Sequence, residues 1–228
     1  MTHIECKIEH NIARILLNRP RKANSYTPDM LNDLMQIWSR VEREARISII
    51  ESSGNGAFCG GADLNEMKKA TVEDALDLLS QRLFDQISRS HVVSIAAIQG
   101  PAVAGGFELT LACDLRVADP NAWFALPEVS KGLIPAAGGC TRLTSLLGAS
   151  IAKGVILGGE HILANQAHTW GLIHRLSNEP RKEAMEWAQS LLAKDPLALK
   201  LAKQVLTSPS LKIERLAEAI LYERKSTS

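Results

Sequence analysis

The sequence carries almost no net charge, and this shortage excludes several kinds of partner. Its 228 residues include 26 Lys and Arg against 25 Asp and Glu, which gives a formal net charge of +1. Binding to nucleic acid or to an anionic membrane surface depends on a strong basic field. We therefore expect neither partner, and any acidic ligand would have to be held by a local group of cations.

Cysteine is also scarce, and long apolar runs are absent. The four cysteines form no Cys-x-x-Cys pair and no cluster with histidine: they are Cys6, Cys59, Cys113 and Cys140. Zinc sites need such spacing, so we expect no metal and free thiols in a reducing compartment. No apolar run is long enough to span a membrane, and the first residues lack the apolar core of a secretory signal. The expected location is cytoplasmic.

The sequence also lacks the common nucleotide and nucleophile motifs. The glycines at 54 and 56 do not continue into a dinucleotide fingerprint, and no lysine follows a glycine loop as it does in phosphate-binding loops. The Gly-x-Ser-x-Gly turn of serine hydrolases is missing as well. No redox cofactor and no serine nucleophile are therefore expected.

What the sequence does contain is a strand, a glycine-rich turn and a helix in direct succession. Residues 94–98 form an apolar run with the length of a buried strand, and Gly100, Gly105 and Gly106 predict an irregular turn. A helical pattern starts at Phe107 and carries Glu108 in its first turn. This is either a tight connection or a ligand site, because helix N-termini offer free N–H groups and glycines let a ligand approach the backbone.

A second stretch repeats this arrangement. The apolar run 47–50 is followed by Ala-Phe-Cys-Gly-Gly-Ala-Asp-Leu at 57–64, which is again a glycine turn leading into a helix start. The two stretches together resemble the crotonase family, the enoyl-CoA hydratases and isomerases. Further motifs occur in that family's order: Asn18-Arg19-Pro20 with Asn24-Ser25, Pro127-Glu128, Gly132-Leu133-Ile134-Pro135 with Gly138-Gly139, and Trp170-Gly171-Leu172-Ile173.

This resemblance implies an α/β fold, a crotonase-like spiral of repeated ββα units with a C-terminal helical module. We place the spiral core at residues 1–178 and the helical module at 179–228, which is shorter than is typical for the family. The residues themselves predict a hairpin over 4–17, a helix that begins at Pro28 after Thr27, and one amphipathic, core-facing helix over 70–89. Gly148 is expected to separate two helices, and three helices are expected after residue 179.

By the same resemblance, the substrate is an acyl-CoA, and coenzyme A enters only as part of that substrate. The N–H groups of Ala62 and Gly105 would bind the thioester oxygen. Small residues cluster there because a side chain would block the thioester. Residues that would contact the substrate or its coenzyme are Arg19, Lys22, Gly60, Gly61, Ala62, Asp63, Leu64, Gly105 and Gly106.

Two acids carry the proposed chemistry. Adding water across a double bond needs a carboxylate that activates the water and a carboxylic acid that protonates the α-carbon. Glu108 and Glu128 match the two glutamates of the family's hydratases, so an enoyl-CoA hydratase is the expected activity. Isomerisation or decarboxylation with one dominant glutamate is the alternative enzyme activity, and a weakly active, truncated partner subunit is the alternative of another class. A homotrimer or homohexamer is expected, because amphipathic C-terminal helices leave an apolar face.

Overall fold

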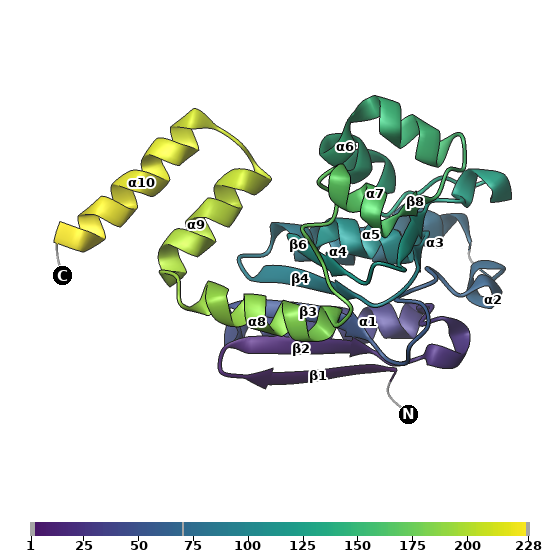
Figure 1. The fold of residues 1–228 in the computed structure, drawn as a ribbon, viewed down its shortest axis with the longest axis horizontal. Helices are drawn as coiled ribbons and strands as arrows, with labels where there is room; N and C mark the ends of the chain where they lie inside the picture. Colours follow the sequence, from purple (N-terminus) through teal and green to yellow (C-terminus); the bar gives the residue numbers. More distant parts are fainter. Residues whose placement is uncertain (1–2, 70, 227–228) are drawn as a thin grey trace.

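The structure is a computed structural model that describes residues 3–69 and 71–226. It contains a six-stranded sheet and a three-stranded sheet, with helices packed around them (Figure 1). The large sheet has the order β1-β2-β3-β4-β6-β9, with strands Ile4–Glu9, Ile12–Leu17, Ile47–Ser52, Val93–Ile98, Leu115–Ala118 and Arg175–Leu176. The small sheet has the order β5-β7-β8, with strands Ala102–Val103, Trp123–Ala125 and Ile162–Leu163.

The first two strands form the predicted hairpin. β1 and β2 pair antiparallel, and the two turn residues His10 and Asn11 have φ angles of 49° and 63°. Positive φ at both positions is the geometry of the tight two-residue turns that match the twist of paired strands. From β2 onward the neighbouring strands of the large sheet are parallel. Every residue of β3 and β4 is buried, as expected for parallel strands covered on both faces.

Helix α1 spans Pro28–Glu44 and begins as predicted, because the Thr27 hydroxyl accepts a hydrogen bond from the Met30 N–H at 3.2 Å. The single helix predicted over 70–89 is wrong. A capping box between Thr71 and Asp74 starts a separate short helix, α3 (Val72–Asp77). Leu78, with a φ of 25°, interrupts the helical geometry before α4 (Leu79–Arg89). Only α4 packs its apolar residues into the core, since the apolar side chains of α3 are exposed.

The two glycine turns of the sequence each lead from a parallel strand into a helix. β3 leads to α2 (Leu64–Met67), and β4 leads to α5 (Gly105–Ala112), whose eight residues are all buried. Helix α6 (Gly139–Ile156) breaks its helical geometry at Gly148, where a helix boundary is predicted. Helix α7 (Ala164–Thr169) and the short 3-10 turns η1 (Pro20–Lys22) and η2 (Glu128–Lys131) complete this part of the chain.

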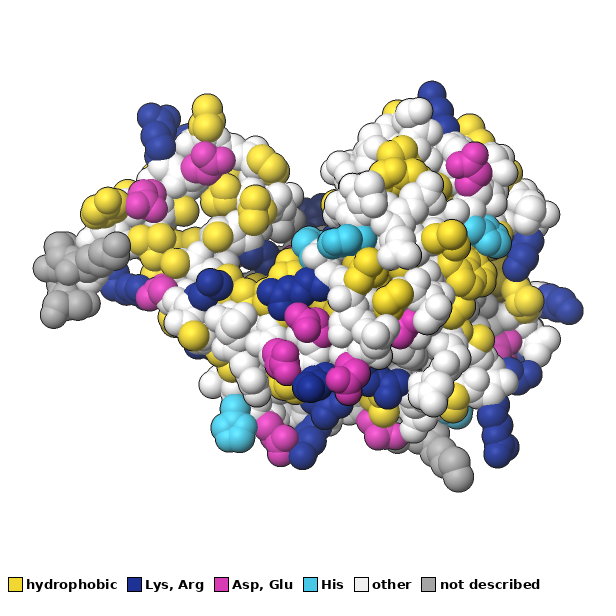
Figure 2. Space-filling model, viewed as in Figure 1, with side chains coloured by type: hydrophobic (Ala, Val, Ile, Leu, Met, Phe, Trp, Pro, Cys, Tyr) yellow, Lys and Arg dark blue, Asp and Glu magenta, His cyan; other side chains and the backbone are white. Residues whose placement is uncertain are grey.

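The last three helices differ in how they meet the rest of the protein. α8 (Pro180–Leu192) lies along the large sheet and buries Ala184, Ala188 and Leu191 in a second apolar core with β3 and β4. α9 (Pro196–Thr207) and α10 (Leu211–Ser226) extend away from the main body (Figure 1). Figure 2 shows hydrophobic side chains on these two helices beside a hollow, and residues of α9, α4, α5 and α6 line a groove of about 1000 Å³.

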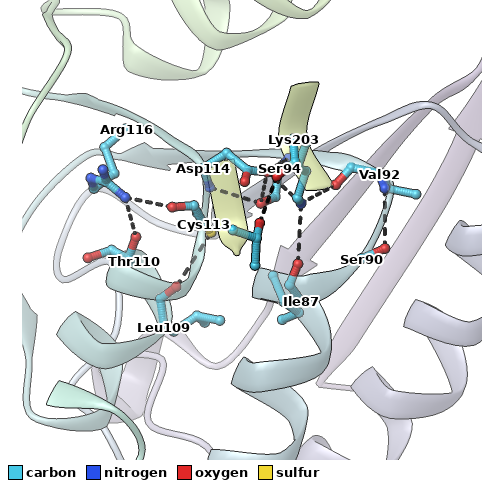
Figure 3. Close-up of polar contacts among 11 residues, drawn as sticks. Ile87, Ser90, Val92, Ser94, Leu109, Thr110, Cys113, Asp114, Arg116 and Lys203 are labelled. Atoms are coloured by element: carbon cyan, nitrogen blue, oxygen red, sulfur yellow. Dashed lines mark hydrogen bonds and ion pairs between the residues drawn. The ribbon is translucent and has the colours of Figure 1, made fainter. Parts of the chain in front are cut away.

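A buried lysine attaches α9 to the main body (Figure 3). Lys203 is only 6% exposed, and its Nζ donates to Asp114 Oδ2 at 2.7 Å and to the Val92 carbonyl at 2.6 Å. Asp114 lies just beyond the C-terminal end of α5, and its Oδ2 also accepts hydrogen bonds from the N–H and hydroxyl of Ser94. Lys203 Nζ also donates to the Ile87 carbonyl of α4 at 3.4 Å. Lys203 therefore links α9 to α4 and, through Asp114, to β4 and the C-terminal end of α5.

None of the helices within residues 3–69 and 71–226 combines the length and apolarity needed to cross a membrane.

Candidate active site

The two glycine turns meet side by side, although about forty residues separate them in the sequence. Cys59 pairs with Ala102 in a parallel bridge, and the Val103 N–H donates to the Cys59 carbonyl at 2.9 Å. A Cβ on Gly106 would lie 2.1 Å from the same carbonyl oxygen. Glycine is therefore required at 106, because any side chain would force the two turns apart.

The predicted oxyanion donors lie where these turns meet. A Cβ built on Gly61, the residue before Ala62, would come within 3.0 Å of the Gly105 nitrogen. Within the part of the chain that the structure describes, neither the Ala62 N–H nor the Gly105 N–H has a hydrogen-bond acceptor. Gly105 is also the first residue of α5, where the helix dipole favours negative charge. The arrangement can bind a carbonyl oxygen that becomes negative.

The space beside Gly105 is filled differently from the prediction. A Cβ on Gly105 would lie only 1.9 Å from the hydroxyl oxygen of Tyr26, a residue that is 9% exposed. The small residue at 105 is thus required by the packing of Tyr26 against it, which the sequence pattern does not reveal. Tyr26 is absent from the predicted site, and the sequence analysis assigns it no role.

Glu108 occupies the first turn of α5 and is 4% exposed. Its Oε1 accepts a hydrogen bond from the Gly139 N–H, at the start of α6, at 2.8 Å. Burial raises the pKa of Glu108 to about 7, the Gly139 hydrogen bond opposes this rise, and the charge of Glu128 adds to it. A carboxyl group with this pKa can both take up and release a proton near neutral pH.

Glu128 is the first residue of η2, which follows β7. Its Oε2 is buried and has no hydrogen-bond partner among residues 3–69 and 71–226. Burial raises the pKa of Glu128, while its own backbone N–H and the charge of Lys131 lower it. The charge of Glu128 contributes to the raised pKa of Glu108, so the two acids that the sequence analysis selected lie within range of each other's charge. An unpartnered buried carboxylate oxygen indicates a place for a polar ligand or a water molecule.

The proposed coenzyme-binding cations lie in different environments. Arg19 donates from Nη1 to Asp63 Oδ2 at 2.6 Å and to the Ser25 carbonyl at 3.1 Å. This hydrogen bond from Arg19 lowers the pKa of Asp63, and the Asn65 N–H that Asp63 caps lowers it further. Arg19 thus braces the turn that leads to α2, whereas Lys22 is exposed at the end of η1. Of the two, Lys22 is the cation that faces solvent.

The other predicted contacts belong to the same turn. The Gly60 N–H donates to the Ala23 carbonyl at 2.9 Å, and a Cβ on Gly60 would meet the Ser25 hydroxyl oxygen at 2.8 Å. Leu64, the first residue of α2, exposes 55% of its surface beside Ala62. All the predicted contact residues therefore lie in the two glycine turns, in the first residues of the helices that follow them, or in the loop over 18–25.

Ala104 is strained in a way that glycine would not be. It precedes α5 with φ 52° and ψ −131°, a conformation that favours glycine. We expect Ala104→Gly to raise the free energy of unfolding by about 1 kcal/mol, as measured by urea denaturation, because relief of the strain exceeds the added chain entropy. Ala102→Gly is the control: this strand residue has no positive φ, so the change should destabilise. A loss of stability in Ala104→Gly would contradict the argument.

The raised pKa of Glu108 predicts a pH-dependent stability. A carboxyl group with a folded pKa of about 7 and an ordinary value of 4.5 stabilises the fold below pH 4.5, and this contribution is lost as pH rises through 7. Gln cannot ionise, so the variant Glu108→Gln should not lose this stability. The difference in unfolding free energy between the variant and the unsubstituted protein should therefore shift by about 2 kcal/mol in favour of the variant when the pH is raised from 5 to 8. Urea titrations at both pH values measure this gain. The exposed Glu186 supplies the control, Glu186→Gln, which should show no such gain; a flat difference for Glu108→Gln would refute the assignment.

The fold and the paired glycine turns define the class of this protein, an α/β enzyme with the crotonase fold. The family model "Enoyl-CoA hydratase/isomerase" matches residues 7–226. The chain belongs to this enoyl-CoA hydratase/isomerase family, within the crotonase superfamily, as the sequence motifs predict.

Individual relatives agree with this family. The chain is 34% identical over 209 residues to 2,3-dehydroadipyl-CoA hydratase of Escherichia coli, covering 90% of this chain and 82% of that protein. It is 32% identical over 204 residues to the short-chain-enoyl-CoA hydratase of Clostridium acetobutylicum, with coverages of 87% and 78%. The crystal structure of an enoyl-CoA hydratase from Bacillus anthracis superposes with a TM-score of 0.90 at 32% identity and covers 97% of this chain and 90% of that one.

Proposed function

We propose that this protein is an enoyl-CoA hydratase that adds water reversibly, with syn geometry, to the double bond of a 2-enoyl-CoA. The observation that carries the proposal is the pair of acids. Glu108 and Glu128 come from different elements, α5 and η2, yet the charge of one raises the pKa of the other. Isomerisation or decarboxylation would need only one of them.

The backbone donors would act on the thioester. As the hydroxyl of water bonds to the β-carbon, electrons shift toward the thioester oxygen, which becomes negative. The Ala62 and Gly105 N–H groups would stabilise this charge, and removal of a single such donor typically costs 10²–10³-fold in rate. Such donors cost no reorganisation during the reaction, because both are fixed by the fold.

The acids would move the protons. One carboxylate accepts a proton from the attacking water, and the other acid gives its proton to the α-carbon, so that a hydroxyl group and a hydrogen atom are added. Two interacting acids that share protons titrate as a pair, which can keep one ionised and the other protonated near neutral pH. The raised pKa values of both glutamates favour this state.

The coenzyme would lie along the loop over 18–25. Lys22 is the exposed cation suited to a diphosphate, while Arg19 would contribute through the turn that it braces with Asp63. The reaction needs no redox cofactor and no metal, because water and two carboxyl groups supply every atom that moves. The apolar side chains of α9 and α10 and the adjacent groove would be covered in a homotrimer or homohexamer.

Turnover in labelled water tests this proposal. Purified protein should consume a short 2-enoyl-CoA, followed by the loss of the absorbance of the conjugated thioester. In oxygen-18 water, one labelled oxygen should appear in the 3-hydroxyacyl product. Consumption of the substrate without label would show isomerisation or another reaction and would reject the hydratase proposal, and an absence of turnover across a panel of acyl-CoAs would favour a partner subunit.

A further inference from the structure

One residue contacts both turns that carry the proposed oxyanion donors. We propose that Tyr26 is a positioning residue, which holds the Ala62 and Gly105 N–H groups at their working separation. The inference rests on the proposed function for the identity of these donors, and it assigns a role to a residue outside the proposed set of catalytic and substrate-binding residues.

The main chain of Tyr26 fixes the first donor. Its N–H donates to the Gly61 carbonyl at 2.9 Å, and its carbonyl accepts from the Asp63 N–H at 2.9 Å. These two bonds bracket Ala62, with which Tyr26 pairs in a parallel bridge. Successive residues of an extended segment point their N–H groups to opposite sides. Because the Asp63 N–H points toward Tyr26, the Ala62 N–H points away from it. The hydrogen bonds of Gly61 and Asp63 to Tyr26 thus fix Ala62 in place while its N–H stays available to a ligand.

The side chain of Tyr26 fixes the second donor. The hydroxyl oxygen is the atom nearest to a Cβ on Gly105, at 1.9 Å, and the adjoining ring carbons Cζ and Cε1 follow at 2.8 and 3.0 Å. The ring also packs edge-on against Phe84 of α4, with centroids 6.1 Å apart. A buried ring held between α4 and the start of α5 limits how far Gly105 can move toward the core.

The hydroxyl adds polarity at this position without adding charge. Burial raises the pKa of Tyr26, and the charges of Cys59, Glu108 and Glu128 raise it further, whereas an interaction with the Ser80 side chain lowers it. Tyr26 therefore stays protonated while the nearby acids titrate. A charged group here would alter the proton balance of the two glutamates, and a smaller apolar group would leave a gap behind Gly105.

Enolisation of bound acetoacetyl-CoA reports how strongly the two N–H donors stabilise a negative oxygen. This thioester has acidic α-protons, and its enolate absorbs in the near ultraviolet, so an oxyanion site lowers the pH at which the bound ligand enolises. The variants are Tyr26→Leu, which removes the ring and the hydroxyl, and Tyr26→Phe, which removes only the atom nearest Gly105. Phe84→Leu is the matched control. Phe84 packs on Tyr26, but none of its atoms is among the three nearest to a Cβ on Gly105.

We expect Tyr26→Leu to raise the pKa of the bound ligand by about one unit, a tenfold loss of enolate stabilisation. Tyr26→Phe should give a smaller rise in the same direction, and Phe84→Leu, which keeps the Tyr26 ring and its hydroxyl, should give a much smaller rise than Tyr26→Leu. With enoyl-CoA, kcat should fall by about tenfold in Tyr26→Leu, whereas the affinity for free coenzyme A stays within about twofold. If Tyr26→Leu does not fold, Tyr26→Phe carries the test by the same readout.

Unchanged enolisation in the folded Tyr26 variants would overturn the proposal, as would an equal shift in Phe84→Leu, which would show a general effect of core packing. The failure of the proposed function has a different signature. A protein that enolises bound acetoacetyl-CoA but does not hydrate enoyl-CoA would lack hydratase activity and still possess the oxyanion site that Tyr26 positions.

Discussion

Glu108→Gln is expected to lower kcat for hydration of a 2-enoyl-CoA by at least about 10²-fold, the usual scale for a positioned acid or base. The amide keeps the shape of the carboxyl group, and its oxygen can still accept the Gly139 N–H. It cannot accept a proton from water or give one to carbon. The measurement is the initial rate of loss of the enoyl thioester absorbance at saturating substrate.

Glu128→Gln should have an effect of similar size for the same reason. Its Oε2 is buried without a partner in the described part of the chain, so the substitution removes no structural hydrogen bond of that atom. The double variant should lose much less than the product of the two single losses, because the acids act as a unit on one water molecule. A loss in the double variant equal to the product of the two single losses would mean that the two residues act in separate steps.

The affinity for free coenzyme A and the activity of Glu186→Gln serve as controls for the acid variants. Neither should change, because the acids are not proposed to hold the nucleotide and Glu186 lies exposed on α8. Isomerisation predicts a different pattern: one Gln variant abolishes activity while the other is mild, and no oxygen-18 enters the product. That pattern would remove the reason for assigning two acids to one reaction.

The glycine turns, and an acid in the first helical turn after one of them, could be predicted from the sequence because their constraints are local, whereas the choice of Glu128 follows only from the family resemblance. A strand, a turn of glycines and a helix that begins with an acid can be recognised within about twenty residues, and Gly106 shows why that pattern is required. The break at Leu78 was not predictable in the same way. The apolar residues on both sides of it continue a helical spacing, and the capping box at Thr71 marks where α3 begins rather than where it ends.

The contacts that cross the fold could not be predicted at all. Tyr26 reaches Gly105 across 79 residues of sequence, and nothing in the sequence around either residue indicates that a phenol fills the space beside that glycine. Arg19 belongs to a motif that suggests a coenzyme contact. Its ion pair with Asp63 becomes apparent only in the folded structure, where the loop over 18–25 packs against the turn before α2. The short strands β5 and β8, of two residues each, carry too little pattern to be detected.

A large loss of stability is expected from Asp114→Asn, about 3 kcal/mol or more in the free energy of unfolding. This change leaves the ammonium group of Lys203, whose side chain is 5% exposed, bonded within the described residues to neutral oxygens. Lys203→Met should cost less, because Asp114 would keep both hydrogen bonds from Ser94 and its side chain is 25% exposed. The size of the loss therefore depends on which charge remains buried without its partner.

Urea denaturation of the two single variants and the double variant measures this asymmetry as a double-mutant cycle. The double variant, Asp114→Asn with Lys203→Met, should be more stable than Asp114→Asn alone, because it removes the charge that the first change leaves unpaired. Arg224→Met is a control, since this residue lies in α10 and pairs with Asp195 at the exposed start of α9. Equal losses in both single variants, with additivity in the double variant, would mean that Lys203 fixes α9 through the carbonyls of Ile87 and Val92 rather than through Asp114.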